Sequence, residues 1–315
     1  MGLSIAPDHL KRYAGLARLL YKYGNRDLVE RAGLEDALAG DDEPQPASAR
    51  AATELAADLE RMGPTYIKLG QLLSTRADLL PSSYLEALSR LQDDVEPFPF
   101  SDVEAIVQEE LGVRMSKGFG RFDPEPIAAA SLGQVHRATL RDGREVAVKV
   151  QRPDARSQVT QDLSAFAEIA DFLDRHTTAG RQNGFAEVVE EFRKTIIDEL
   201  DYRREAQNLR TLRANLEEFK LLFVPAPIDD YSTGRVLTME FVTGRKLKSM
   251  SPVMRVDLDG AAYADQLLHA YLKQIIIDGF FHADPHPGNV LLTDDGRLAV
   301  GAVAPQALYS ALAAR

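Results

Sequence analysis

The hydrophobic pattern changes its period between Ile127 and Pro153, and this change constrains the fold class. The stretch reads "IAAASLGQVHRATLRDGREVAVKVQRP", in which short segments flank the turn-forming tripeptide Arg-Asp-Gly. Alternating apolar and polar residues predict strands, and a short glycine-containing turn between two such segments predicts an antiparallel pair. Before and after this stretch, apolar residues recur at helical spacing. We therefore expect an α+β chain in which a small antiparallel sheet is surrounded by helices.

Acidic and proline-bearing stretches divide the chain into segments. The text "AGDDEPQPAS" reads as a linker, and "EPFPFSD" interrupts the helical text again. Five segments are expected: an amphipathic helical region and linker over 1–48, a helical extension over 49–125, a sheet-containing lobe with inserted helices over 126–244, the start of a mostly helical lobe over 245–300, and a divergent tail over 301–315.

Composition excludes several classes of function. The 315 residues include no cysteine, which removes disulfides, zinc–thiolate sites and thiol catalysis. The formal net charge of −11 argues against a nucleic-acid partner, because phosphate backbones require a basic surface. No apolar stretch approaches the roughly 20 residues of a membrane span, and the N-terminal text lacks the apolar block of a secretory signal. We expect a cytoplasmic protein.

A basic amphipathic helix is expected near the N-terminus. Its apolar stripe consists of Leu10, Tyr13, Leu16, Ala17 and Leu20, with lysine and arginine on the remaining surface. Such a helix packs against its own protein or lies on an anionic membrane. Peripheral contact with the inner face of a membrane is therefore one expectation for this helix, and packing within the protein is the other.

Lys149 is the first residue that suggests chemistry. It lies in "VAVKVQ", where the three valines point to one face of the strand, and Ala147, Lys149 and Gln151 point to the other. A lysine in such a place is ordinarily solvated. The match to the V-A-[IV]-K pattern of protein kinases favours a phosphate-binding role instead. In kinases a glycine-rich loop precedes this strand, whereas the corresponding loop here, Ala128 to Gly133, contains one glycine and should be stiffer.

A lysine of this kind needs a carboxylate partner on a helix. The text "DELDYRREAQN" places Asp201, Glu205 and Asn208 on one helical stripe. By spacing alone, an exposed charged helix explains the same pattern.

The stretch "HADPHPGN" resembles a kinase catalytic loop. Asp284 and Asn289 stand five residues apart, as the Asp and Asn do in H-R-D-x-x-x-x-N. Asp284 would orient a hydroxyl or a water, and Asn289 would hold a magnesium ion. Pro285 and Pro287 exclude a helix here, which argues against a helical zinc pair of histidines. A plain proline-rich turn is the competing interpretation.

An adenine site is expected around "LTMEFVTG". Met239 would lie at the back of the pocket, and the backbone of Glu240 and Val242 would bind the base edge. The competing interpretation is an ordinary strand. A further helix, ending before Gly279, is expected to carry one apolar face with Leu267, Leu268, Tyr271, Leu272, Ile275 and Ile276.

The order of these motifs resembles that of the UbiB family of atypical kinases, also called ABC1 or ADCK. The similar text runs from about Tyr13 to Val300 and comprises "YIKLGQLLSTRADLLP", "AAASLGQVHRA", "VAVKVQ", "ELDYRREAQN" and "HADPHPGNVLL". Lys68, Gly70 and Gln71 match the K-x-G-Q signature of the family. Because a glycine costs a helix interior about 1 kcal/mol, a packing reason is expected at Gly70.

The resemblance implies a protein-kinase-like fold with a small N-lobe and a mostly helical C-lobe, and a bound ATP or ADP with Mg²⁺. It implies that the K-x-G-Q helix covers the nucleotide and that Lys68 reaches toward Glu199 and Asp201, which match the E-x-D pair of the family. It also implies that Lys149 pairs with phosphates and with Glu205. It further implies that Ala128, Ala129, Ala130 and Ser131 form an alanine-rich nucleotide loop and that Asp284 and Asn289 act in catalysis and metal binding. Members resemble ATPases or atypical kinases that support quinone-lipid biosynthesis or lipid homeostasis at a membrane, so quinone-pathway proteins or an isoprenoid lipid are expected partners.

The sequence departs from the family pattern after Val300. The family continues into D-F-G, whose Asp is a principal magnesium ligand, whereas Gly301, Ala302 and Val303 follow here. A truncated or frame-shifted gene and a shortened chain are both consistent with this text. We expect weaker metal binding and phosphoryl transfer, and self-association through the uncovered helix face.

Three functions remain open from the sequence. The first is an atypical kinase or ATPase of the UbiB type. The second is a nucleotide-binding pseudokinase that acts as a scaffold. The third is a small-molecule phosphotransferase of the aminoglycoside or choline kinase type, against which the K-x-G-Q and E-x-D motifs argue.

Overall fold

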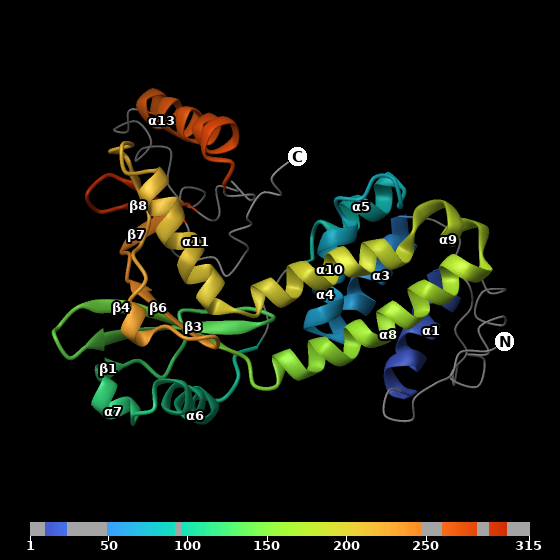
Figure 1. Ribbon diagram of the computed structural model, residues 1–315, viewed down its shortest axis with the longest axis horizontal. Helices are drawn as coiled ribbons and strands as arrows, with labels where there is room; N and C mark the ends of the chain where they lie inside the picture. Colours follow the sequence, from blue (N-terminus) through green and yellow to red (C-terminus); the bar gives the residue numbers. More distant parts are fainter. Residues whose placement is uncertain (1–9, 24–48, 92–95, 247–259, 282–289, 301–315) are drawn as a thin grey trace. The chain divides into compact units, whose positions relative to one another are not determined.

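The computed structural model describes residues 10–23, 49–91, 96–246, 260–281 and 290–300. The chain forms two compact units (Figure 1). Unit 1 contains Met1–Val95 and Asp154–Asp198, and unit 2 contains Glu96–Pro153 and Glu199–Arg315. The helical segment Asp154–Asp198, which follows the strand of Lys149, is thus grouped with the N-terminal helices and not with the sheet.

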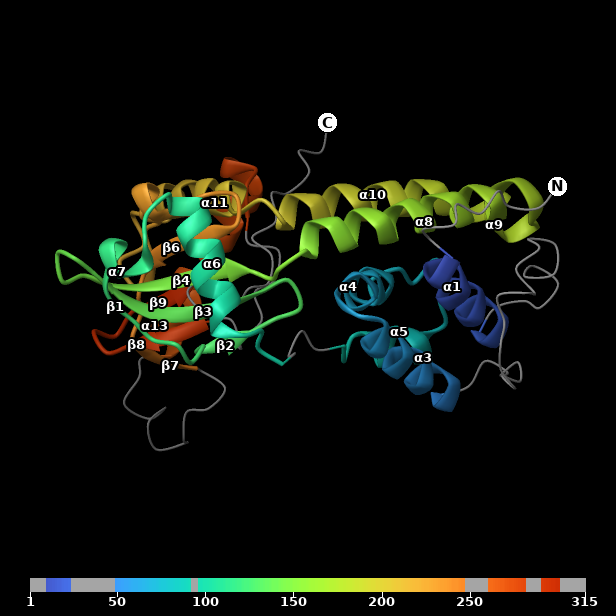
Figure 2. The ribbon, with the colours of Figure 1, turned by 90° about the horizontal axis from the view of Figure 1, so that it is seen from below.

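In the described part of unit 1, all regular secondary structure is helical. Its helices are α1 (Leu10–Tyr23), α3 (Ala49–Met62), α4 (Pro64–Leu73), α5 (Ser82–Leu88), α8 (Ala155–His176), α9 (Thr178–Asn183) and α10 (Phe185–Glu199). Pro64 occupies the first turn of α4, where its missing N–H has no helical partner to lose. The side chain of Asp174 in α8 accepts hydrogen bonds from the N–H groups of Phe185 and Ala186, both at 2.9 Å, and so caps the start of α10. Helices α8 and α10 lie side by side (Figure 2), with Phe166 and Phe192 in ring contact.

The apolar stripe of α1 is used inside unit 1. Tyr13 and Ala17 are fully buried, and Leu16 is nearly so. Arg12 forms an ion pair of 2.7 Å with Asp162, which also accepts a hydrogen bond of 2.6 Å from Thr65. The stripe therefore packs against the protein itself. Contact of this helical region with a membrane stays a prediction, and it would require either other residues of the region or a rearrangement that exposes the stripe.

Unit 2 contains two sheets. Their strands are β1 (Phe119–Phe122), β2 (Ala128–Ala129), β3 (Gly133–Leu140), β4 (Glu145–Gln151) and β6 (Val236–Glu240) in the first, and β5 (Leu222–Phe223), β7 (Gly244–Lys246), β8 (Val290–Thr293) and β9 (Leu298–Val300) in the second. The first sheet is antiparallel, with the order β1-β3-β4-β6 and β2 paired to β3. The order of the second is β5-β9-β8-β7, in which only the β5–β9 pair is parallel. At the Arg-Asp-Gly turn, Gly143 has a φ of 89°, which glycine adopts readily.

The described helices of unit 2 include one on each face of the first sheet. They are α6 (Phe100–Leu111), α7 (Met115–Gly118), α11 (Tyr202–Asn215), a 3₁₀ turn (Asp229–Tyr231), α13 (Gly260–Lys273) and a π-helical turn (Gln274–Asp278). Helices α6 and α11 lie on opposite sides of the sheet (Figure 1). The three valines of β4 join the core beneath α6, whereas Ala147 joins a second core beneath α11. The predicted alternation of faces in β4 is thereby confirmed.

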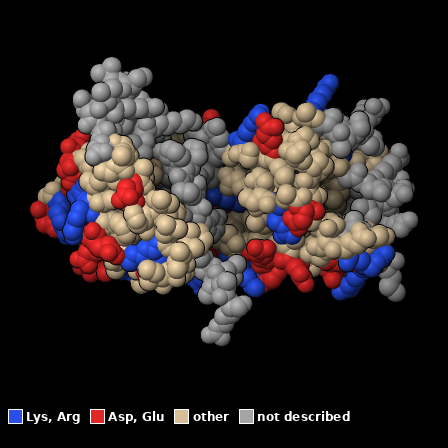
Figure 3. All heavy atoms as spheres, turned by 90° about the horizontal axis from the view of Figure 1, so that it is seen from above, with Lys and Arg blue, Asp and Glu red and all other residues tan. Residues whose placement is uncertain are grey.

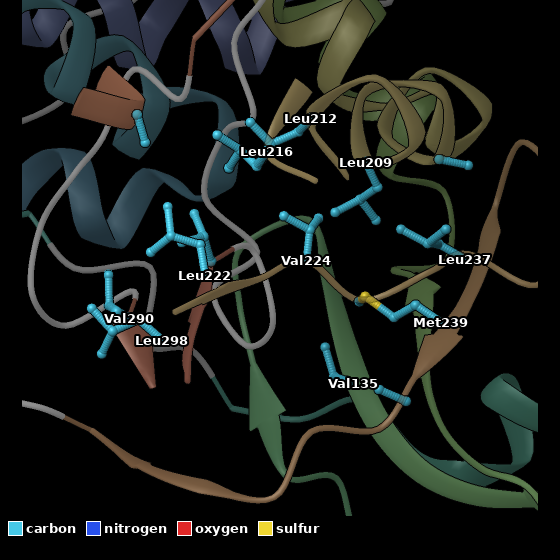
Figure 4. Close-up of a cluster of buried hydrophobic side chains, with 14 of the residues drawn as sticks. Val135, Leu209, Leu212, Leu216, Leu222, Val224, Leu237, Met239, Val290 and Leu298 are labelled. Carbon is cyan, nitrogen blue, oxygen red and sulfur yellow. The ribbon is translucent and has the colours of Figure 1, made fainter. Parts of the chain in front are cut away.

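The core beneath α11 extends from the first sheet to the second. Figure 4 shows Leu209 and Leu212 of α11 above Val135, Leu237 and Met239, with residues of the second sheet beside them. One continuous apolar cluster thus connects the helix to both sheets, and this fixes the height of α11 above β4.

A buried polar network holds the chain that enters α6. The side-chain carbonyl of Gln134 accepts a hydrogen bond of 2.9 Å from the N–H of Phe98, and its amide donates to the Phe98 carbonyl at 3.3 Å. The same amide lies 2.9 Å from Nε2 of His136, whose Nδ1 lies 2.8 Å from the carbonyl of Asp123. Because a carbonyl only accepts, Nδ1 carries the proton, and Nε2 accepts from Gln134. Gln134 and His136 of the "GQVH" segment therefore have a structural role, because they bind the backbone of Phe98 and Asp123.

The apolar face expected on the helix before Gly279 is divided. Leu267 packs against the core beneath α11, whereas Leu268 and Leu272 point to solvent. The π-helical turn that follows exposes three consecutive isoleucines, Ile275 to Ile277. Gly279 ends the turn with a φ of 61°, as predicted. The extra residue in a π turn changes the direction of the side chains after it, which a regular helical period does not anticipate.

Candidate functional site

Lys149 and Glu205 form an ion pair between β4 and α11. The Nζ of Lys149 donates to Oε2 of Glu205 at 2.6 Å. Lys149 is 3% exposed because α11 covers the strand face on which it lies. The lysine is therefore not the solvated residue that its strand position alone predicts. The partner comes from a helix 56 residues away in the sequence.

Tyr202 completes the surroundings of this ion pair. The ammonium of Lys149 lies 4.6 Å from the centre of the Tyr202 ring, within the range of a cation–π interaction. Burial, assisted by the negative charges of Glu205 and Glu199, raises the pKa of the Tyr202 phenol well above its ordinary value. Tyr202 was not singled out in the sequence. Its position three residues before Glu205 on the same helix is the signal that could have identified it.

The alanine-rich stretch forms the tip of a hairpin between β2 and β3. Ala128 and Ala129 make up β2, and the N–H of Ala130 donates to the carbonyl of Gly133 at 2.7 Å. Ala130 and Ser131 are buried. A Cβ on Gly133 would lie 2.5 Å from the Tyr202 hydroxyl and 2.7 Å from the carbonyl of Val150. The one glycine of the loop is therefore required by close packing beneath the hairpin.

The segment expected to bind the adenine base comprises the end of β6 and the residues after it, and its side chains contact the core beneath α11, the second sheet and a neighbouring loop. Met239 is buried in the core beneath α11. The Glu240 carboxylate accepts from Arg213 and from the N–H of Ala226, both at 2.9 Å. Val242 packs against the second sheet. Binding of a base edge by the backbone of Glu240 and Val242 stays a prediction.

The E-x-D residues lie at the junction of α10 and α11. Glu199 is the last residue of α10, and Asp201 caps α11 by accepting from the N–H of Arg203 at 3.2 Å. This cap satisfies one of the backbone donors that a helix start leaves without a helical partner.

The K-x-G-Q residues lie on α4 in unit 1. Lys68 is 7% exposed, and Gln71 donates to the Leu91 carbonyl at 3.3 Å. A Cβ on Gly70 would contact the side chains of Leu91 and Leu59 at less than van der Waals distance, which is the expected packing reason. Because Lys68 belongs to unit 1 and Glu199 and Asp201 to unit 2, their approach stays a prediction.

The predicted catalytic loop, with Asp284 and Asn289, lies outside the described residues. Among the residues that are described, no group of three or more acidic or histidine side chains is arranged to hold a metal. In the same ranges, no helix is both long enough and apolar enough to cross a bilayer. On the face of the molecule in Figure 3, acidic and basic side chains of the described residues are interspersed.

Residues 90–301 match the model of the ABC1 atypical kinase-like domain. The chain belongs to this family. It is 43% identical over 242 residues to the chloroplastic protein ACTIVITY OF BC1 COMPLEX KINASE 8 of Arabidopsis thaliana, an alignment that covers 76% of this chain and 32% of the relative. It is 39% identical over 249 residues to a probable protein kinase UbiB of Marinobacter nauticus, covering 79% and 45% of the two chains. The resemblance inferred from the motifs is confirmed.

A solved structure supports the fold. The Rv3197 protein of Mycobacterium tuberculosis, determined in complex with erythromycin, superposes with a TM-score of 0.54 at 32% identity, covering 81% of this chain and 65% of that one. The ABC1 chain therefore has the expected α+β, kinase-like architecture, in which an antiparallel sheet accompanies a mostly helical remainder. The chain spans less than half the length of the two curated relatives described above.

Proposed function

We propose that this ABC1 chain binds ATP or ADP together with Mg²⁺ in unit 2, and acts as an atypical kinase or ATPase of the UbiB type. The observation that carries the proposal is the ion pair, 2.6 Å long, between the buried Lys149 and the partly exposed Glu205. In kinases, a strand lysine held by a helix carboxylate contacts the α- and β-phosphates. A buried ammonium with one carboxylate partner suits that task, since its remaining protons are available to phosphate oxygens.

The other roles follow the family pattern. Ala128, Ala129, Ala130 and Ser131 would cover the phosphates, and Met239, Glu240 and Val242 would receive the adenine. Asp284 would orient the attacking group, and Asn289 would hold Mg²⁺, which neutralises charge on the phosphates. From unit 1, Lys68, Gly70 and Gln71 would regulate access, with Lys68 directed at Glu199 and Asp201.

The biological setting we propose is support of quinone-lipid biosynthesis or of membrane lipid homeostasis. The similarity to probable protein kinase UbiB favours this setting. Pathway proteins or an isoprenoid lipid would then be the partners, in the cytoplasm or at the inner face of a membrane.

A nucleotide-binding scaffold without turnover is the second candidate. The observation that favours it is the sequence after β9, where Gly301, Ala302 and Val303 stand in place of D-F-G. Without the aspartate, Mg²⁺ would lose a principal ligand and phosphoryl transfer would slow by orders of magnitude.

Nucleotide binding and turnover test these candidates separately. ATP or ADP should raise the melting temperature of the unaltered chain, and Lys149→Met should abolish the rise. Lys194→Met, which removes an exposed lysine of α10, is the matched control and should preserve it. Magnesium-dependent ATP hydrolysis that Asp284→Asn removes would support the enzyme; nucleotide binding without hydrolysis would support the scaffold. If the unaltered chain binds neither nucleotide, the proposed function is wrong.

A further inference from the structure

Two hydroxyl groups, one in the alanine-rich hairpin and one next to it, are buried without a hydrogen-bond partner among the described residues. They are Oγ of Ser131 and the phenolic oxygen of Tyr202. Each residue is 1% exposed. A buried hydroxyl that donates to nothing costs roughly 1–3 kcal/mol, so two of them in one place require an explanation.

The two hydroxyls lie in the same part of unit 2. The Tyr202 oxygen lies directly beneath Gly133, since it occupies the space where a Cβ would be. Ser131 precedes Gly133 by two residues, so their Cα atoms are at most about 7 Å apart. The ring that carries the Tyr202 hydroxyl also contacts the ammonium of Lys149, 4.6 Å from the ring centre. Two neutral donors and one cation are therefore gathered at the base of the hairpin.

The chemistry of this group favours an anion. The raised pKa of Tyr202 keeps the phenol protonated, so it can donate a hydrogen bond. Ser131 donates equally well, and Lys149 supplies positive charge. Phosphate oxygens accept several such bonds at once, and hydrogen bonds to charged acceptors are the stronger kind.

We propose that Tyr202 is a further ligand-binding residue, whose hydroxyl donates, together with that of Ser131, to a phosphate oxygen of the nucleotide held by Lys149. This inference rests on the proposed function and adds a residue to it. Since both hydroxyls are closed to solvent, the phosphate enters as the hairpin tip at Ala130–Leu132 lifts, and the tip then closes over it. The two donors are without partners in the free protein and gain one in the complex.

The proposal predicts opposite effects of one substitution on stability and on binding. Tyr202→Phe and Ser131→Ala each remove a hydroxyl that has no partner in the free protein, so urea unfolding should show unchanged or higher stability. The affinity for ATP and ADP, measured by calorimetry, should fall about tenfold for each variant, as expected for loss of a hydrogen bond to a charged group. Affinity for adenosine, which has no phosphate, should not change.

Tyr231→Phe is the matched control in the same unit. Its hydroxyl donates to the carbonyl of Gly118 at 3.0 Å and lies outside the proposed site. This variant should therefore lose stability and keep its affinity for ATP. A role for Tyr202 in folding alone would give Tyr202→Phe the same result as this control.

The outcomes separate the inference from the proposed function. If the unaltered chain binds ATP and both hydroxyl variants bind it equally well, the inference is wrong and nucleotide binding stands. If Tyr202→Phe lowers the stability of the free protein, a bridging water or another internal partner satisfies the hydroxyl, and the inference is again wrong. If the unaltered chain binds no nucleotide, both proposals are wrong. Should Tyr202→Phe fail to fold, the same comparison with Ser131→Ala decides.

Discussion

Lys149 and Glu205 share an ion pair but differ in their access to water. The side chain of Lys149 is 4% exposed and that of Glu205 is 22% exposed. The lysine depends on its partner for compensation of its charge, whereas water solvates part of the carboxylate. This difference leads to a prediction about stability that is independent of catalysis.

Removing the carboxylate should destabilise unit 2 more than removing the lysine. Glu205→Gln leaves a buried ammonium without a counter-charge, and we expect a loss of about 2–3 kcal/mol, below the usual cost of breaking a fully buried pair because Glu205 is partly solvated. Lys149→Met replaces the ammonium by an apolar group of similar volume beside an apolar cluster, and should change stability by less than about 1 kcal/mol. Urea unfolding of the two variants measures the difference. Equal losses would contradict this account.

Gly133 should tolerate no side chain. Gly133→Ala places a Cβ 2.7 Å from the backbone carbonyl of Val150, and backbone cannot move aside as a flexible side chain can. We expect a loss of at least about 2 kcal/mol in the free energy of unfolding. At Gly260, in the first turn of α13, a Cβ would meet nothing within 4 Å. Gly260→Ala is therefore the control, and should leave stability unchanged or raise it slightly. Similar melting temperatures for both variants would show that the hairpin can shift.

A pH dependence is expected from His136. Burial lowers the pKa of this imidazole, because the interior disfavours its charged form. The unfolded chain then binds a proton that the folded chain does not bind, so stability should be complete above about pH 6.5. It should fall as the pH decreases below that value toward the lowered folded-state pKa, with a slope of up to about 1.4 kcal/mol per pH unit.

His136→Asn should remove this contribution, since the amide can still donate to the carbonyl of Asp123 and does not titrate. The comparison is the stability difference between pH 7 and pH 5, measured by urea unfolding. His269 of α13 has an exposed side chain, and His269→Asn is the control that should retain the dependence of the unaltered chain. An identical pH profile for His136→Asn and the unaltered chain would contradict the assignment.

Local sequence patterns predicted which segments form helices and strands. They predicted less well which residues of those segments are buried and what these residues contact. The alternation in β4 assigned each side chain to the correct face, because that face is set by the backbone period alone. The burial of Lys149 depends on α11, which is separated from β4 in the sequence by the helices α8, α9 and α10. No local pattern contains that information, and only the resemblance to a family led to the correct partner, Glu205.

The same limit applies to Gly70 and Tyr202. A glycine inside a helix predicted a close approach, and the leucines that approach it come from α3 and from the chain after α5. For Tyr202, the sequence shows an aromatic residue on a charged helix. Its contact with Lys149 and its position beneath Gly133 arise from packing between elements distant in the sequence. The π-helical turn after α13 was likewise not predicted, because its text continues a helical apolar pattern.

The exposed apolar residues near the end of α13 should cause self-association. Ile276 and Ile277 are 74% and 75% exposed, and Leu268, Leu272 and Ile275 of the same segment are exposed as well. An exposed cluster of this kind favours contact with another apolar surface. Replacing both isoleucines by glutamine should shift the chain toward a monomer in sedimentation velocity, with unchanged nucleotide affinity. Leu267→Gln is the contrasting variant because Leu267 packs against the core beneath α11, and it should lower stability without reducing association. A monomeric unaltered chain at micromolar concentration would refute the prediction.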